Sequence, residues 1–187
     1  MRTTAPGQSA LLFLDVAAVL QREQVDYAVI GAMAAAVHGV VRASLDADAV
    51  LSFTTQDAQR LEQAFIAAGF HAELRRGDMD DPIACLLALT DTYGNRVDLL
   101  IGLRGLEAAT FSRTIEVPFM GQSLRFVSRE DFLAMKVAAN GPQDIEDARN
   151  VIAAAGDSLD LILLRRLAAQ YSRSAAASLE NLLAKAG

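Results

Sequence analysis

The sequence predicts an α+β fold, in which a mixed β-sheet is flanked by helices and followed by a C-terminal helical tail. Short apolar runs with strand character alternate with amphipathic helical segments as far as Val127. Two pairs of these runs are joined by turn sequences that are typical of hairpins. From Ser128 onwards, apolar residues recur only at helical spacing. We therefore expect an α/β core over residues 1–127 and a helical region, packed on that core, over residues 128–187.

The first half of the chain alternates between the two kinds of element. In chain order, we expect a helix over 10–22, a strand over 27–30, a helix over 32–37, a strand over 47–53, a helix over 56–68 and a strand over 70–74. Gly31 permits the tight turn between the first strand and the second helix. The charged sequence RRGDMDDP, at 75–82, is typical of a loop.

Two hairpins and the tail complete the pattern. The sequence TDTYGN separates strands over 83–89 and 96–101, and Met120-Gly121 separates strands over 114–119 and 123–127. Pro118 places its strand at a sheet edge, because proline has no N–H to donate to a neighbouring strand. In the tail we expect helices over 129–139 and 143–155 and two more that begin near Leu159 and Ser174, with Ser128 and Asp131 forming a cap at the first.

The composition limits the classes of function. The chain has 187 residues and is 52% hydrophobic, but alanine supplies much of that figure and no apolar run approaches the ~20 residues of a membrane-spanning helix. A net charge of −6 disfavours a large nucleic-acid partner, because such partners are bound by clustered Lys and Arg. The single cysteine allows no internal disulfide and is typical of a reducing compartment. We therefore predict a cytoplasmic protein without a membrane segment.

Three aspartates are the strongest candidates for a functional site. Asp46 and Asp48 are one residue apart in a predicted strand, so both side chains point to the same face. Asp98 lies between apolar neighbours in RVDLLIG, where a carboxylate needs a cation or hydrogen-bond donors nearby. If the two strands are adjacent, three carboxylates converge, and this ligand set suits Mg²⁺. The alternative is that these aspartates end strands and cap turns.

Candidate phosphate-binding groups accompany the aspartates. The turn after Gly31 leads into a helix, whose first backbone N–H groups can bind an anion. Lys136 follows Phe132 by four residues, so both side chains lie on the apolar face of one predicted helix. A lysine on such a face needs an anionic partner, or its side chain must extend to solvent. Arg42, just before Asp46, is a similar candidate, although an exposed loop arginine would be unremarkable.

Several of these segments together resemble a known family. The strings YAVIGAMAAAVHGVVRASLDADAVL, NRVDLLIG, SREDFLAMKVAA and QDIEDARNVI resemble the DNA polymerase beta superfamily of nucleotidyltransferases. Within it they are similar to the AbiEii-like group of small bacterial nucleotidyltransferases, which includes toxins of toxin–antitoxin systems. The resemblance covers residues 25–154. It implies a mixed sheet flanked by helices, as the pattern also predicts.

The resemblance also implies an activity and the residues that perform it. Asp46 and Asp48 would be ligands of the catalytic metal ions, and Asp98 would bind one of them and act on the acceptor hydroxyl. Gly31 and Ala32 would hold the triphosphate of the nucleotide. The implied reaction moves a nucleoside monophosphate from an NTP, with two Mg²⁺ ions, to a hydroxyl of RNA, a protein or a small molecule. An antitoxin protein is a further implied partner, and Lys136 occupies the place of a lysine that reaches the phosphates.

Two departures from the family pattern support a second hypothesis. Ala32 stands where the family has Gly or Ser, so a hydroxyl is missing and a methyl group is added. The family's basic residue is absent from the sequence before Asp144, and we interpret Asp144 and Asp147 as structural acids at a helix start. The alternative is therefore a catalytically degenerate domain of the same fold that binds a nucleotide or a partner.

Overall fold

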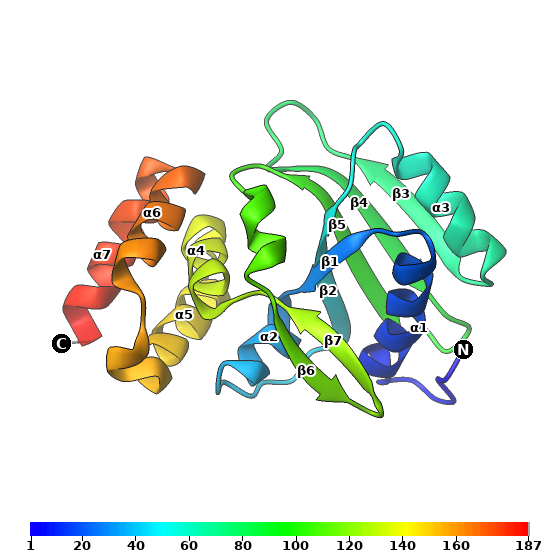
Figure 1. The fold of residues 1–187 in the computed structure, drawn as a ribbon, viewed down its shortest axis with the longest axis horizontal. Coiled ribbons are helices and arrows are strands. Elements are labelled where there is room, and N and C mark those ends of the chain that lie inside the picture. Colours follow the sequence, from blue (N-terminus) through cyan, green and yellow to red (C-terminus); the bar gives the residue numbers. More distant parts are fainter. Residues whose placement is uncertain (187) are drawn as a thin grey trace.

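The computed structural model describes residues 1–186 and contains a seven-stranded mixed sheet with the strand order β3-β4-β5-β2-β1-β7-β6 (Figure 1). The strands are β1 Asp26–Val29, β2 Asp46–Ser52, β3 His71–Arg76, β4 Ile83–Thr90, β5 Arg96–Leu103, β6 Ile115–Phe119 and β7 Gln122–Phe126. The pairs β2–β5 and β1–β7 are parallel and the others are antiparallel. The predicted α+β class with a mixed sheet is confirmed.

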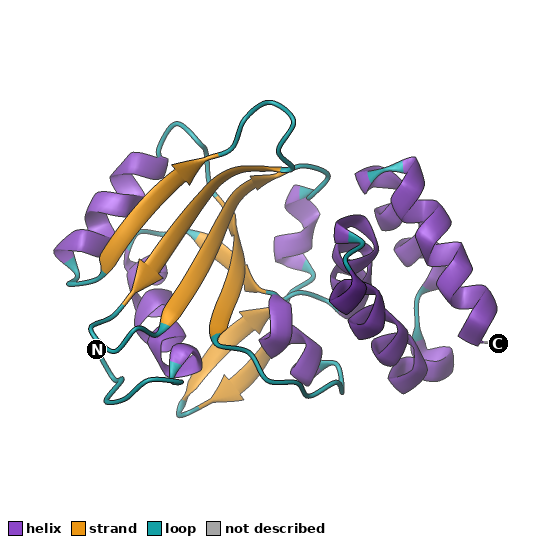
Figure 2. Cartoon of the chain, turned by 180° about the vertical axis from the view of Figure 1, so that it is seen from behind, coloured by secondary structure: helices purple, strands orange, loops and turns teal. Residues whose placement is uncertain are grey.

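One face of the sheet is packed against helices α1 (Ser9–Arg22) and α3 (Ala58–Ala67). Their apolar side chains, such as Phe13 and Phe65, are fully buried together with alternate residues of the central strands. This burial supplies most of the stabilisation of the core, at roughly 25 cal/mol per Å² of apolar surface. From the opposite side, the strands β3, β4 and β5 face the viewer with no helix over them (Figure 2). This face of the sheet is therefore not covered by a helix at β3, β4 and β5.

The C-terminal helices form a group beside the sheet (Figures 1 and 2). They are α4 Arg129–Ala139, α5 Pro142–Ala155, α6 Leu161–Tyr171 and α7 Arg173–Ala186, and they pack on one another. The predicted cap is confirmed, because the Ser128 hydroxyl accepts a hydrogen bond from the Asp131 N–H at 3.1 Å. Among the described residues, none of the helices combines the length and apolarity needed to cross a bilayer.

Most predicted elements are present with ends that differ by one or two residues. Pro118 lies in β6, the edge strand, as predicted. The prediction of a loop from residue 75 is wrong at its start, because β3 continues through Arg75 and Arg76. Arg75 is opposite Leu86 in the ladder with β4, and its exposed side chain forms an ion pair with Glu73. Charged residues are tolerated in this edge strand because one of its faces is in water.

Candidate active site

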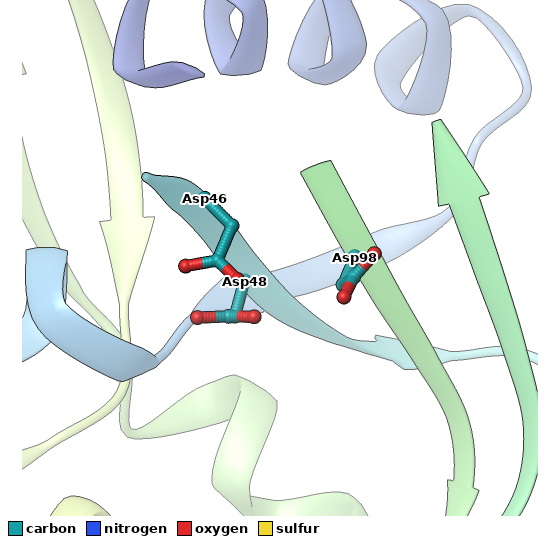
Figure 3. A group of neighbouring side chains, drawn as sticks. All are labelled: Asp46, Asp48 and Asp98. Atoms are coloured by element: carbon teal, nitrogen blue, oxygen red, sulfur yellow. The ribbon is translucent and has the colours of Figure 1, made fainter. Parts of the chain in front are cut away.

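The register of β2 and β5 brings the three predicted aspartates together. Asp48 lies opposite Asp98 in the parallel pair, and Asp46 precedes Asp48 by two residues on the same face. The intervening Ala47 and the following Ala49 are buried on the other face, in the core. One carboxylate oxygen from each aspartate lies within 4.8 Å of the others (Figure 3). The predicted convergence of the carboxylates is confirmed.

A glycine turn lies directly against the central carboxylate. Gly31 begins the short helix α2 (Gly31–Val37) with φ of 63°, a left-handed conformation that favours glycine. The backbone N–H of Ile30 donates to the carbonyl of Asp48 at 2.9 Å, which holds the turn beside β2. A Cβ atom on Gly31 would overlap the Asp48 carboxylate. Gly31 is therefore required both by the backbone conformation and by the space that Asp48 occupies, and Ala32 follows it as a buried residue.

Asp48 has an unfavourable environment for its negative charge. Burial, together with the neighbouring negative charges of Asp46 and Asp98, raises its pKa from the ordinary value of 3.8 to about 6. Lys136 and Arg42 oppose this shift of the pKa but do not cancel it. The cluster therefore has surplus negative charge and oxygen ligands only. Both properties fit a hard divalent cation such as Mg²⁺.

The outer two carboxylates each have a hydrogen-bond partner on the same segment. The Ser44 hydroxyl donates to Asp46 at 2.6 Å. The guanidinium of Arg96 forms a bidentate ion pair with Asp98, at 2.7 Å from Nε and 2.9 Å from Nη2. Sequence reasoning missed Arg96, although the spacing R-V-D in a strand places its side chain on the same face as that of Asp98.

A cleft of about 400 Å³ opens beside Asp48, where the sheet meets the helical tail. Gly31, Arg42 and Lys136 line it together with Asp48. Its walls are mainly apolar and come from β5, α4 and the end of α6, with Leu100, Leu103, Phe132, Met135 and Tyr171 among them. A larger hollow of about 690 Å³ lies between α1 and the β6–β7 hairpin, and it is lined by none of the predicted site residues. Of these two hollows, the cleft beside Asp48 is therefore the one that contains predicted site residues.

The two predicted phosphate-binding cations already have anionic partners within the chain. Lys136 is buried, with 8% of its surface exposed, and its Nζ lies 2.7 Å from Asp144 and 2.9 Å from Asp147. Arg42 also contacts Asp147, at 3.2 Å. Lys136 therefore has an anionic partner, as its position on a packed stripe predicts. Asp144 and Asp147 do more than favour a helix start, because Asp144 contacts Lys136 and Asp147 contacts both Lys136 and Arg42.

Comparison with solved structures identifies the architecture. ANT(2″)-Ia, in complex with adenylyl-2″-tobramycin, superposes with a TM-score of 0.59 at 16% identity, over 87% of this chain and 98% of the other. A nucleotidyltransferase-like protein from Paracoccidioides brasiliensis gives 0.54 at 15%, over 98% and 91% of the two chains. The chain has the nucleotidyltransferase fold. The lincosamide antibiotic adenylyltransferase LnuA, solved with lincomycin bound, is a further neighbour, with a TM-score of 0.51 at 14% identity over 80% and 98%.

Sequence comparisons add no closer relationship. No protein-family model matches the chain, and no curated protein matches its sequence. The identities to these three structures are between 14% and 16%, a range in which likeness shows a shared fold and not a shared substrate. The assignment of an activity therefore depends on the residues of the nucleotidyltransferase-fold site itself.

Proposed function

We propose that this protein is a Mg²⁺-dependent nucleotidyltransferase that moves a nucleoside monophosphate from an NTP to an acceptor hydroxyl and releases pyrophosphate. The observation that carries the proposal is the convergence of Asp46, Asp48 and Asp98 beside the Gly31 turn. A purely structural role does not account for this cluster, because like charges in contact destabilise the fold. A divalent cation with a bound triphosphate accounts for both the ligands and the open cleft.

The carboxylates have distinct roles in this proposal. Asp46, Asp48 and Asp98 hold Mg²⁺, which supplies Lewis-acid stabilisation of the charge on the phosphates. Asp98, at the end of the cluster towards the open sheet face, also accepts a hydrogen bond from the acceptor hydroxyl and orients it for attack. For this, Arg96 must give up at least one of its two bonds to Asp98.

The nucleotide is held at this cleft, which is lined by Gly31, Arg42 and Lys136 and which Ala32 adjoins in the chain. The backbone N–H groups at Gly31 and Ala32 bind the triphosphate, and Arg42 and Lys136 contribute positive charge beside it. Because Ala32 has no side-chain hydroxyl, only its backbone N–H can contact the phosphate. The cleft lies where the predicted core of residues 1–127 meets the helical region of residues 128–187, and we propose that these two regions are the functional units between which the nucleotide binds.

We propose a small hydroxylated molecule as the acceptor. Two of the neighbours were solved with an adenylylated antibiotic or an antibiotic bound, and the cleft of about 400 Å³ is of a size that suits a small molecule. The net charge of −6 favours this class over RNA.

The resemblance to the AbiEii-like group supports instead a toxin that modifies RNA or a protein and is neutralised by an antitoxin. Growth arrest on expression of the protein, relieved in the Asp48→Asn variant, would favour that role.

The second candidate is a degenerate domain that binds a nucleotide or a partner without transfer. Ala32 favours it, because a phosphate-binding hydroxyl is absent there. The Lys136–Asp144 and Arg96–Asp98 ion pairs favour it too, because both must open before substrates are bound. Nucleotide binding without transfer to any acceptor would support this alternative. Transfer would exclude it.

Incubation with labelled NTPs tests the proposal. Each α-labelled NTP is incubated with Mg²⁺ and, in turn, with total RNA, cell lysate or a panel of hydroxylated antibiotics, and the label is followed into acceptor and pyrophosphate. We expect transfer with the wild-type protein and with the control Asp157→Asn, an exposed acid far along the tail. Asp46→Asn and Asp48→Asn should lose at least roughly a hundredfold in rate, because each loses a metal ligand. Transfer that persists in Asp48→Asn would refute the site.

A further inference from the structure

Asp147 is a buried carboxylate at the junction between the tail and the core. It lies on α5 and is 1% exposed. Three donors surround it: Lys136 at 2.9 Å, Arg42 at 3.2 Å and the side-chain amide of Gln143 at 3.0 Å. A buried carboxylate is costly unless it is paired. Asp147 has two cationic partners, and they come from segments that are far apart in the sequence.

The two partners of Asp147 are the cations of the candidate nucleotide cleft. Arg42 belongs to the irregular loop between α2 and β2, immediately before the metal-binding strand. Lys136 belongs to α4, where it also lies 5.5 Å from the centre of the Phe132 ring. Both side chains line the cleft with Asp48 and Gly31. Asp147 therefore fixes a loop residue and a helix residue side by side, with the positive groups at the wall of one cleft.

Asp144 contacts the same lysine in a different environment. Its Oδ1 accepts from Lys136 at 2.7 Å, its Oδ2 accepts from the N–H of Gly141 at 3.3 Å, and its side chain is 28% exposed. Unlike Asp147, it is itself part of the cleft lining. Water can solvate Asp144 when its ion pair opens, whereas Asp147 has little access to water. An anion that enters the cleft will therefore replace Asp144 at Lys136 more readily than Asp147.

We infer that Asp147 is a positioning residue that holds Arg42 and Lys136 ready for the triphosphate, and that Asp144 is the internal anion which the triphosphate displaces from Lys136. The inference rests on the proposed function, because it concerns the nucleotide of that same reaction. It assigns opposite effects to two acids that are three residues apart on one helix. Asp147 promotes the binding of a polyphosphate, and Asp144 competes with it.

Titration calorimetry with inorganic triphosphate and Mg²⁺ tests this inference on the full-length protein. Asp147→Asn should weaken triphosphate binding roughly tenfold or more, because both cations lose the charge that orients them. Asp144→Asn should tighten binding by about twofold to fivefold, since a partly exposed competing ion pair is lost. The control Asp157→Asn removes one negative charge from the tail without touching the cleft, and it should bind as the wild type does.

The two variants are expected to change triphosphate affinity in opposite directions, and this distinguishes a positioning role from a general loss of structure. A purely structural role for the two acids would weaken binding in both variants, and this result would overturn the inference. Unchanged binding in Asp147→Asn would also overturn it. If Asp147→Asn does not fold, the variant Asp144→Asn at the partly exposed acid decides the question alone: tighter binding supports the displacement, and equal or weaker binding refutes it.

Failure of the inference can be distinguished from failure of the proposed function, because binding and transfer are measured separately. A protein that binds triphosphate in the expected order of variants but transfers no nucleotide would refute the proposed function and leave the inference intact. A protein that transfers nucleotide while Asp147→Asn binds triphosphate as the wild type does would refute only the inference.

Discussion

Replacement of Asp48 by Asn should stabilise the metal-free protein at neutral pH. The pKa of Asp48 is raised from 3.8 to about 6 by burial and by the charges of Asp46 and Asp98. At about 1.4 kcal/mol for each pKa unit, ionisation of this group costs the folded state about 3 kcal/mol above pH 6. Asn has nearly the same shape and no charge. The variant should therefore be more stable than the wild type by about 2–3 kcal/mol at about pH 7.5.

The sign of the pH dependence follows from the raised pKa. The folded protein binds the Asp48 proton more tightly than the unfolded chain does, so this group lowers stability as the pH rises from about 4 to about 6. Below about pH 4 both states are protonated at this position, and the difference between the variant and the wild type should disappear. Above about pH 6 the difference should be constant.

Urea unfolding in EDTA at about pH 4 and about pH 7.5 measures the effect, with Asp157→Asn as a surface control that should change stability by less than about 0.5 kcal/mol. Added Mg²⁺ should stabilise the wild type and leave Asp48→Asn unchanged, because binding to the folded state adds to stability only where a site exists. A variant that is less stable than the wild type in EDTA at about pH 7.5 would show that Asp48 is a well-compensated structural acid.

Two further substitutions test the surroundings of the carboxylates. Gly31→Ala should lower the free energy of unfolding by about 1–3 kcal/mol or more, because a φ of 63° strains alanine. It should also abolish the stabilisation by Mg²⁺, because the added Cβ overlaps the Asp48 carboxylate. Gly94→Ala, also at positive φ but with open space around the Cβ, should show only the strain in the same urea assay; equal losses in the two variants would contradict the overlap. Arg96→Gln should lower the Mg²⁺ concentration needed for half-saturation by about twofold to fivefold, since Arg96 competes with a cation for Asp98. Calorimetric Mg²⁺ titration measures this, and a higher requirement in the variant would mean that Arg96 supports metal binding.

The sequence predicts the local geometry of the site well because that geometry depends on short-range rules. Alternation along a strand places Asp46 and Asp48 on one face, and a glycine between a strand and a helix indicates a tight turn. The apolar sequence around Asp98 identifies a central strand. Only the pairing of β2 with β5 had to be assumed, and the structure confirms it.

The sequence does not predict which side chains of distant segments contact one another in the site. Asp147 appears as an ordinary acid in the first turns of a helix, and its partner Arg42 is 105 residues away. The pairing exists because the helical tail packs against the loop before β2, and no local pattern encodes that packing. The charge of Arg75 alone predicts a loop, but an edge strand with one face in water accepts arginine.

A crystal structure with Mg²⁺ and a non-hydrolysable ATP analogue would show whether the three aspartates form a metal–nucleotide site. We predict Mg²⁺ bound by the carboxylates of Asp46, Asp48 and Asp98, with the triphosphate over the Gly31 turn and within reach of Lys136. Arg96 should have released at least one oxygen of Asp98. A nucleotide bound elsewhere, for example in the hollow between α1 and the β6–β7 hairpin, or a carboxylate cluster without metal beside a bound nucleotide, would contradict the account.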